Sequence, residues 1–226
     1  MYIFLDTETT GVEDDDRLCQ LAYKYSGHSV NKMFKPSKPI SFEASAVNHI
    51  TNKMVEDKET FADSETKSEL QELINQDGII VAHNAVFDIG MLSREGIQVG
   101  KFIDTIKMAM FLDVNAKCKK YNLQYLRYYL GLEIEVVAHD AMGDVIILEA
   151  VFNILVDSFK KQFGDKYVEK MIEISSKPAI IRVMSFGKHR GLKMEDVPVD
   201  YLEWLVSTGL KDKPDLAYTI DKILKK

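Results

Sequence analysis

The chain has 226 residues, a length that suits one medium domain with a small addition. A hydrophobic fraction of 46% and a charged fraction of 28% are ordinary for a soluble globular protein. The first apolar segment meets Asp6 too early for a signal peptide, and no later segment approaches the roughly 18 apolar residues of a membrane span. We therefore expect a cytoplasmic protein without a membrane partner.

The net charge is −6, which differs from the basic footprint of many nucleic-acid-binding proteins. The charge is uneven, because residues 177–226 contain ten basic and seven acidic side chains. A nuclease site built of carboxylates can also be acidic, since bound cations invert the local field. Composition alone neither supports nor excludes a nucleic-acid substrate.

Apolar segments and turn signals predict an alternation of strands and helices. The predicted strands cover residues 2–5, 18–25, 30–34 and 79–82, with a brief fifth strand that ends at Ile103. The predicted helices cover residues 66–75, 86–95, 105–112, 123–130 and 141–163. A meander followed by alternating helices and strands predicts an α/β fold, with a mixed five-stranded sheet flanked by helices.

A Ser/Pro break at residues 175–178 predicts a boundary between a domain of residues 1–176 and a small C-terminal module of residues 177–226. The module should contain a strand over 179–184, a glycine-bracketed basic turn over 185–192 and a helix that begins after Pro198. We expect Phe186, Tyr201 and Trp204 to form its small core. Three basic residues of this turn, and a fourth directly after it, are either solvated or contact phosphates. They are Lys188, His189, Arg190 and Lys193.

Two acids follow the first predicted strand. Asp6 and Glu8 are two residues apart, so their side chains point to the same face of an extended chain. Hydrolysis of a phosphodiester by two metal ions needs several such oxygen ligands. The next three residues, Thr9, Thr10 and Gly11, predict a tight turn with hydroxyl and N–H groups suited to the 3' end of a nucleotide.

Two further acids lie on predicted helices, and each has an ordinary alternative interpretation. Asp88 is either a solvated residue in a first helical turn or a ligand. Asp144 begins an almost wholly apolar helix, where a carboxylate is costly unless it is paired or bound to a metal. His139 precedes this helix and is either an inert loop residue or a general base with a suitable pKa.

Taken together, five segments resemble the DEDDh branch of the DnaQ-like exonucleases, over roughly residues 1–160. They are FLDTETTG, VNHIT, GIIVAHNAVFDIGML, FIDTIKMA and AHDAMGD. The resemblance implies an RNase H-like fold and a 3'→5' exonuclease that needs two divalent cations, Mg²⁺ or Mn²⁺. It implies four metal ligands, Asp6, Glu8, Asp88 and Asp144, with His139 as general base. It further implies contacts to the terminal nucleotide from Thr7, Thr9, Thr10, Gly11, His49 and Phe87.

The sister branch has a tyrosine four residues before its last aspartate, and Asp140 at that position here disfavours it. The segment SFGKHRGLKMEDVPVDYLEWL is similar to the C-terminal segment of bacterial exodeoxyribonuclease X enzymes. That similarity implies a DNA substrate with a single-stranded or frayed 3' end, nucleoside 5'-monophosphates as products and a role in DNA repair.

The alternatives are an exoribonuclease of the ribonuclease T or oligoribonuclease type, a proofreading subunit of a DNA polymerase, and a non-catalytic nucleic-acid-binding module. The sequence leaves open the choice between DNA and RNA and between monomer and homodimer. Other acids have simpler interpretations. Residues 13–16 should form a solvated loop, Asp140 should cap a helix, and Asp104 should be a helix cap or support the site.

Overall fold

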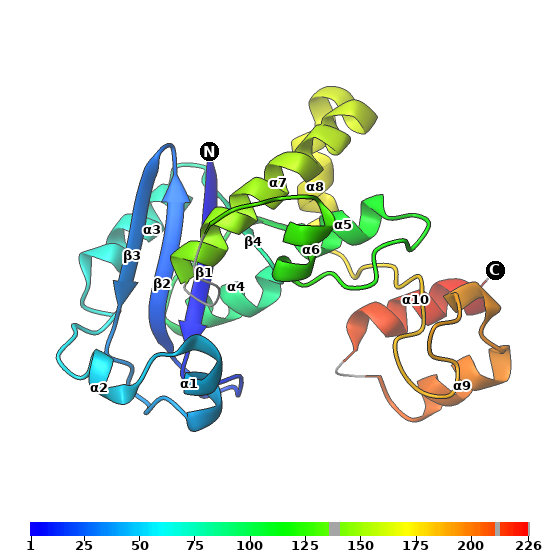
Figure 1. Cartoon of the computed structure of the whole chain (residues 1–226), viewed down its shortest axis with the longest axis horizontal. Helices are drawn as coiled ribbons and strands as arrows, with labels where there is room; N and C mark the ends of the chain where they lie inside the picture. Colours follow the sequence, from blue (N-terminus) through cyan, green and yellow to red (C-terminus); the bar gives the residue numbers. More distant parts are fainter. Residues whose placement is uncertain (136–140, 211–212, 226) are drawn as a thin grey trace.

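The structure is a computed structural model that describes residues 1–135, 141–210 and 213–225. At its centre lies a five-stranded sheet with the order β3-β2-β1-β4-β5 (Figure 1). The strands are β1 (Tyr2–Thr9), β2 (Leu18–Tyr25), β3 (His28–Met33), β4 (Ile79–Ala82) and β5 (Lys101–Asp104). The first three form an antiparallel meander, whereas β4 and β5 run parallel to β1. The predicted mixed sheet is confirmed.

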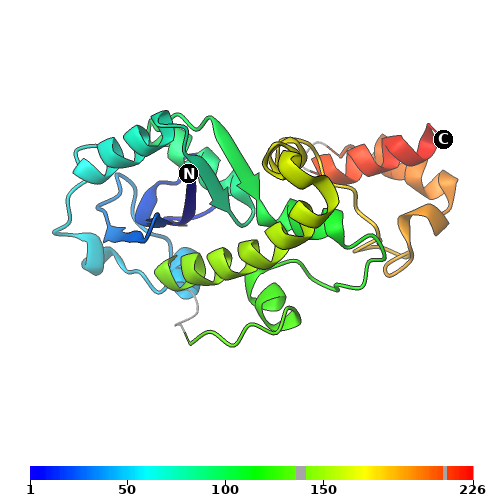
Figure 2. The ribbon, with the colours of Figure 1, turned by 90° about the horizontal axis from the view of Figure 1, so that it is seen from above.

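Helices cover both faces of this sheet, as Figure 2 shows from above. Those within the first 175 residues are α1 (Phe42–Asn48), α2 (Asn52–Val55), α3 (Glu65–Asn75), α4 (Ala85–Arg94), α5 (Thr105–Leu112), α6 (Leu123–Tyr129), α7 (Ala141–Phe163) and α8 (Tyr167–Ser175). The remaining two helices are α9 (Val199–Ser207) and α10 (Pro214–Leu224). One face therefore carries α3 and α4, and the other carries α7 with its neighbours.

Alternation along β1 decides which of its side chains meets which layer. Ile3 and Leu5 are fully buried in a cluster with Leu70 of α3 and Met91 of α4. Phe4 points the other way and packs on Phe152 of α7, with 5.3 Å between ring centroids. Burying a side chain of this size contributes about 1.5–3 kcal/mol, so the two faces of β1 are held firmly and in a fixed register.

Two parts of the main domain differ from the sequence prediction. β1 continues to Thr9, because its backbone pairs with β2 as far as Leu18, with a bulge between Glu8 and Thr9. The short helices α1 and α2 were not predicted. The first begins after Ser41, whose hydroxyl accepts a hydrogen bond from Ala44 N–H as a helix cap does.

The C-terminal residues build a hydrophobic cluster of their own around Met184, Leu202, Leu205 and Ile220. The strand predicted over residues 179–184 is wrong, because this segment has a single isolated bridge from Val183 to Lys193. Two of its other N–H groups donate to side chains of α10, Ala179 to Asp215 at 2.8 Å and Ile181 to the Thr219 hydroxyl at 2.9 Å.

The predicted aromatic core of this module holds only in part. Phe186 and Tyr201 pack against its cluster, half-buried. Trp204 is 53% exposed, and its ring lies 5.3 Å from the Tyr201 ring. The prediction is therefore wrong for Trp204, which projects from α9 towards solvent.

Cys19 and Cys118 are both buried free thiols. Among the described residues, none of the helices combines the length and the apolar character needed to cross a membrane.

Candidate active site

The predicted acids come from three elements that meet near the C-terminal half of β1. The pairing of β1 with β4 ends at Phe4 and Val81, so α4 can approach the rest of this edge. Asp88, in the first turn of α4, accepts hydrogen bonds from the Thr7 N–H at 3.1 Å and the Thr7 hydroxyl at 2.7 Å. Asp88 is thereby attached to the residue between Asp6 and Glu8.

Asp6 and Glu8 share the face of β1 that carries Phe4, and this face is covered by α7. Asp144 lies in the first turn of α7, and its carboxylate accepts a hydrogen bond from the Gln124 side chain of α6 at 2.8 Å. Figure 1 shows α7 beginning beside the C-terminal half of β1 and running back along it. The three elements that carry the predicted acids, β1, α4 and α7, therefore meet in one region of the fold.

Asp88 is the most enclosed of these acids, with 3% of its surface exposed. Burial raises the pKa of Asp88 well above its usual range, and the nearby Asp104 carboxylate adds to the rise. The two hydrogen bonds from Thr7 act in the opposite direction. A positive charge placed beside this carboxyl group would lower its pKa and favour the ionised form.

Asp104 fixes the start of α4 as well as that of α5. Its carboxylate accepts hydrogen bonds from the Asn84 and Ala85 N–H groups, both at 3.2 Å, and from Ile106 N–H at 2.9 Å. The predicted helix cap is confirmed by the bond from Ile106. Asn84 has a left-handed backbone with φ of 69°, so the two extra bonds hold an unusual turn just before the helix that carries Asp88.

His83 ties the same turn to the loop that precedes α6. Its Nε2 lies 2.7 Å from the Tyr121 carbonyl oxygen, and its Nδ1 lies 2.8 Å from the Thr105 hydroxyl. The carbonyl can only accept, so Nε2 carries the proton. Burial lowers the pKa of His83 to about 4, which makes the neutral ring the form present at neutral pH.

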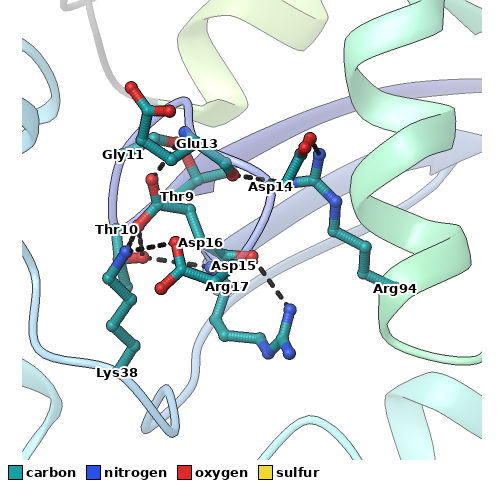
Figure 3. Close-up of polar contacts among 10 residues, drawn as sticks. All are labelled: Thr9, Thr10, Gly11, Glu13, Asp14, Asp15, Asp16, Arg17, Lys38 and Arg94. Carbon is teal, nitrogen blue, oxygen red and sulfur yellow. Dashed lines mark hydrogen bonds and ion pairs between the residues drawn. The ribbon is translucent and has the colours of Figure 1, made fainter.

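The predicted turn after β1 is held from inside the protein (Figure 3). Thr10 is fully buried, its N–H donates to the Arg17 carbonyl at 2.9 Å, and its hydroxyl donates to Asp16 at 2.6 Å. The Thr9 hydroxyl donates to the Gly11 carbonyl at 2.6 Å. Both donors of Thr10 are thus engaged with the protein, which gives this residue a supporting role.

His49 is brought beside this turn by its neighbour in the chain. Asn48, the last residue of α1, donates from its side chain to the Thr9 carbonyl at 3.1 Å. His49 follows with a left-handed φ of 60° and an exposed side chain. Phe87 lies one residue before Asp88, half-buried and outside the four clusters that the described buried residues form.

Sequence reasoning missed three supporting residues, Asn48, His83 and Asp16, and treated as alternatives the cap and the support that Asp104 combines. The solvated loop predicted for residues 13–16 is wrong at Asp16, which is 3% exposed, although Glu13, Asp14 and Asp15 are exposed. Each of these residues acts through a partner distant in sequence, so a local pattern gives no signal for them.

His139 and Asp140 lie outside the described residues, and so the predicted base and cap have no structural description. Within the described ranges, no group of three or more His, Cys, Asp or Glu side chains is arranged to hold a metal ion. The carboxylates around β1 are nonetheless the hard oxygen donors that suit a small divalent cation.

The basic turn of the C-terminal module packs on α9. Lys188, Arg190 and Lys193 are exposed. The His189 ring contacts the Tyr201 ring edge-to-face, with 4.6 Å between centroids, and is half-buried. The predicted phosphate contacts therefore divide into three exposed cations and one packed ring, and the Lys188 ammonium also lies over the Tyr201 ring, 5.2 Å from its centroid.

Comparison with known families decides the class of this fold. A family model described as an exonuclease matches residues 3–152. The chain belongs to this exonuclease family. The acids on β1, α4 and α7 all fall within the matched residues, and the supporting residues Asp16, Asn48, His83 and Asp104 do so too.

Relatives of the exonuclease extend the similarity to the whole chain. It is 29% identical to exodeoxyribonuclease 10 of Escherichia coli strain K12 over 235 aligned positions, which cover all of this chain and 99% of the relative. It is 30% identical to the epsilon subunit of DNA polymerase III of Treponema pallidum, covering 70% of this chain and 78% of that protein.

A solved structure of exonuclease X in complex with 5'-overhanging duplex DNA matches with a TM-score of 0.59 and 25% identity, over 77% of this chain and 99% of that one. The fold is therefore the RNase H-like fold of these exonucleases. A second family model, named for a proposed quorum-sensing-regulated virulence factor, matches residues 176–220.

Proposed function

We propose that this exonuclease hydrolyses DNA from its 3' end, with the help of two divalent cations, and releases nucleoside 5'-monophosphates. The observation that carries the proposal is the attachment of Asp88 to Thr7, which lies between Asp6 and Glu8 on β1, beside α7 with Asp144 in its first turn. A carboxylate as buried as that of Asp88 costs free energy unless hydrogen bonds or positive charge compensate it.

The four carboxylates are the groups that would hold Mg²⁺ or Mn²⁺. Asp88 supports this role, because a nearby cation would favour its ionised form against the effect of burial. When bound, the ions would supply positive charge to the scissile phosphate and favour deprotonation of the attacking water. Asp104 and His83 keep the start of α4 in place, which fixes the position of Asp88.

The remaining roles fall to residues around the acids. We assign to His139 the removal of a proton from the attacking water, since imidazole is a common general base. Thr9, Gly11, His49 and Phe87 would contact the terminal nucleotide. Thr7 was expected to do so as well, but its N–H and hydroxyl both donate to Asp88, so it would hold that acid in place, as Thr10 holds the turn. Gly11 and His49 lie on the partly open surface at the end of β1.

The names of the relatives support DNA over RNA, since one is an exodeoxyribonuclease and one solved neighbour is in complex with duplex DNA. RNA differs at each residue by a 2'-hydroxyl, which the terminal-nucleotide site would have to accept. The proposal is tested by digestion of matched 3'-labelled single-stranded DNA, duplex DNA with a frayed end, and RNA of the same sequence. Each substrate is incubated with Mg²⁺, with Mn²⁺ and with EDTA.

We expect release of label from both DNA substrates with either ion, and none in EDTA. Faster digestion of RNA than of DNA would replace the DNA assignment with the exoribonuclease one. Full activity in EDTA would reject the role given to the four acids.

A further inference from the structure

Asp16 is a buried acid in a run of exposed ones. It lies between β1 and β2 in the segment Glu13-Asp14-Asp15-Asp16, and only 3% of its surface is exposed. A buried carboxylate costs free energy unless hydrogen bonds or an opposite charge compensate it. The contacts of Asp16 therefore indicate what the protein gains from placing it there.

Three donors converge on this carboxylate (Figure 3). The Thr10 hydroxyl donates to Oδ1 at 2.6 Å, the Glu13 N–H donates to Oδ2 at 2.7 Å, and the Lys38 ammonium lies 2.9 Å from Oδ1. Burial alone would raise the pKa of Asp16, but these three partners together lower it below its usual range. The carboxylate is therefore ionised and fully engaged at neutral pH.

The turn after β1 is packed directly against Asp16. A Cβ atom added at Gly11 would lie 2.4 Å from Asp16 Oδ2, and the three nearest atoms all belong to the Asp16 carboxylate. Only glycine fits between the turn and this carboxylate. The Thr10 hydroxyl also accepts from Arg17 N–H at 3.0 Å, so it joins both ends of the loop.

Hydrogen bonds of the same turn also reach the segment that carries His49. Lys38 comes from the connection between β3 and α1, and three residues later Ser41 N–H donates to the Thr10 carbonyl at 3.1 Å. Asn48 holds the Thr9 carbonyl from the other end of α1. The turn of residues 9–11 and the end of α1 are thus held as one unit, with Asp16 at its centre.

We propose that Asp16, paired with Lys38, is a positioning residue that fixes the turn of residues 9–11 and with it the site for the 3'-terminal nucleotide. The inference rests on the proposed function, in which Thr9, Gly11 and His49 contact that nucleotide. Asp16 lies beneath the turn and acts through Thr10 and Gly11, without touching the substrate. Its loss should therefore weaken binding of the terminal nucleotide more than it slows the chemical step.

The test compares Asp16→Asn with a matched control, Asp15→Asn. Asp15 also pairs with Lys38, at 2.7 Å, but its side chain is exposed, whereas that of Asp16 is buried beneath the turn. The amide keeps the size of Asp16 but loses its charge and accepts fewer hydrogen bonds from the same donors. Three quantities are measured on the full chain with Mg²⁺. They are kcat and KM on a short single-stranded oligodeoxynucleotide, and the Kd of thymidine 5'-monophosphate by direct titration.

We expect Asp16→Asn to raise both KM and the Kd of thymidine 5'-monophosphate by about tenfold, the effect of losing one or two charge-assisted hydrogen bonds. Its kcat should stay within about threefold of wild type, and Asp15→Asn should match wild type in all three quantities. Unchanged KM and Kd in Asp16→Asn, or a loss confined to kcat, would overturn the inference.

If Asp16→Asn does not fold, Lys38→Met provides a second route, because it removes the paired charge and leaves Asp16 in place. It should raise the same two constants by a smaller factor, and a wild-type Kd in this variant would overturn the inference. A third variant, Gly11→Ala, should weaken binding in the wild-type background but add little to Asp16→Ala, where the obstructing carboxylate is gone.

The titration separates this inference from the proposed function. A wild-type chain that digests no oligonucleotide but binds thymidine 5'-monophosphate in an Asp16-dependent way would refute the exonuclease proposal alone. A wild-type chain that digests DNA, with a Kd that Asp16→Asn leaves unchanged, would refute the positioning role alone. Absence of nucleotide binding by the wild-type chain would overturn the inference.

Discussion

The Asp88 carboxylate is enclosed by protein and accepts two hydrogen bonds from Thr7. Two bonds from one residue offset only part of the cost of burying a charge. Asp104, a second buried acid, increases that cost. A cation held beside Asp88, as proposed above, would relieve this cost.

Replacing any one of Asp6, Asp88 and Asp144 by asparagine should lower kcat by about 10²-fold or more, because each change removes a negative oxygen that would hold the cations. The fold should survive, since asparagine keeps the size of the side chain. Steady-state rates with saturating Mg²⁺ and the midpoint of thermal unfolding measure the two effects. Asp14→Asn removes an exposed carboxylate from the same end of the molecule and should leave both unchanged. Wild-type turnover in all three variants would eliminate the acids as ligands.

His139→Ala should lower kcat by about 10²–10⁴-fold, the usual effect of losing a general base. Binding of a short oligonucleotide should change little, because the base acts on the attacking water. The pH–rate profile of the variant should also lose its limb near neutral pH. If turnover and profile match those of wild type, another group removes the proton.

The sequence predicts a strand or helix correctly where its local apolar pattern matches the face that packs in the fold. The strands of the sheet and the long helix α7 were predicted from apolar runs. The role of the acids at β1 stays a prediction. The pattern failed where backbone pairing decides the outcome. Residues 179–184 are as apolar as a strand, yet only Val183 forms a bridge there.

Asp16 could not be distinguished from the exposed acids beside it, because its partner Lys38 is distant in sequence. The short helix α1 was missed for a related reason. It exposes Phe42 and Val47, so its sequence lacks the apolar face of an ordinary amphipathic helix. Its attachment comes instead from Asn48, through a hydrogen bond to β1.

The free energy of unfolding should depend on pH through His83, which lies between β4 and α4 and contacts Thr105 of α5. The pKa of this ring falls from 6.5 to about 4 on folding, so the unfolded chain binds more protons between these values. Stability therefore rises with pH in this window and is lost on acidification. Between pH 7 and pH 5 the loss due to His83 should be about 2 kcal/mol.

Urea unfolding at the two pH values measures this loss, and His83→Gln should reduce it, since glutamine does not titrate. His28→Gln replaces an exposed histidine and should keep the wild-type difference. An equal pH dependence in His83→Gln and wild type would show that His83 is not the origin.

At the scale of the whole molecule, residues 177–226 form a cluster separate from the main core and carry a net positive charge, beside an acidic remainder. At the boundary, the Lys107 ammonium of α5 donates to the Ser175 and Lys177 carbonyls. Figure 1 places α9 and α10 at one end of the molecule, beyond α5. We propose that this module is a separate domain that holds DNA phosphates away from the scissile bond.

Neutralising Lys188, Arg190 and Lys193 together should weaken binding of long DNA. It should also reduce the salt slope of binding by roughly one unit for each side chain that no longer neutralises a phosphate. The kcat on a saturating short oligonucleotide should be nearly unchanged. Binding measured over a range of salt concentrations gives the slope. A control that neutralises Lys160, Lys161 and Lys166, exposed near the far end of α7, removes the same charge. If both triple variants lower the slope equally, the module has no specific role in binding.

The most direct measurement of the proposed chemistry follows both ends of one DNA strand at the same time. A single-stranded oligodeoxynucleotide carries one label on its 3'-terminal nucleotide and a different label at its 5' end, and digestion with Mg²⁺ is sampled from the earliest times. We predict that the 3' label is released first, as a nucleoside 5'-monophosphate, while the 5' label stays on a ladder of strands that shorten by single nucleotides. Asp6→Asn and EDTA should both abolish the ladder. Early release of the 5' label, or internal fragments that carry either label, would contradict a 3'→5' exonuclease.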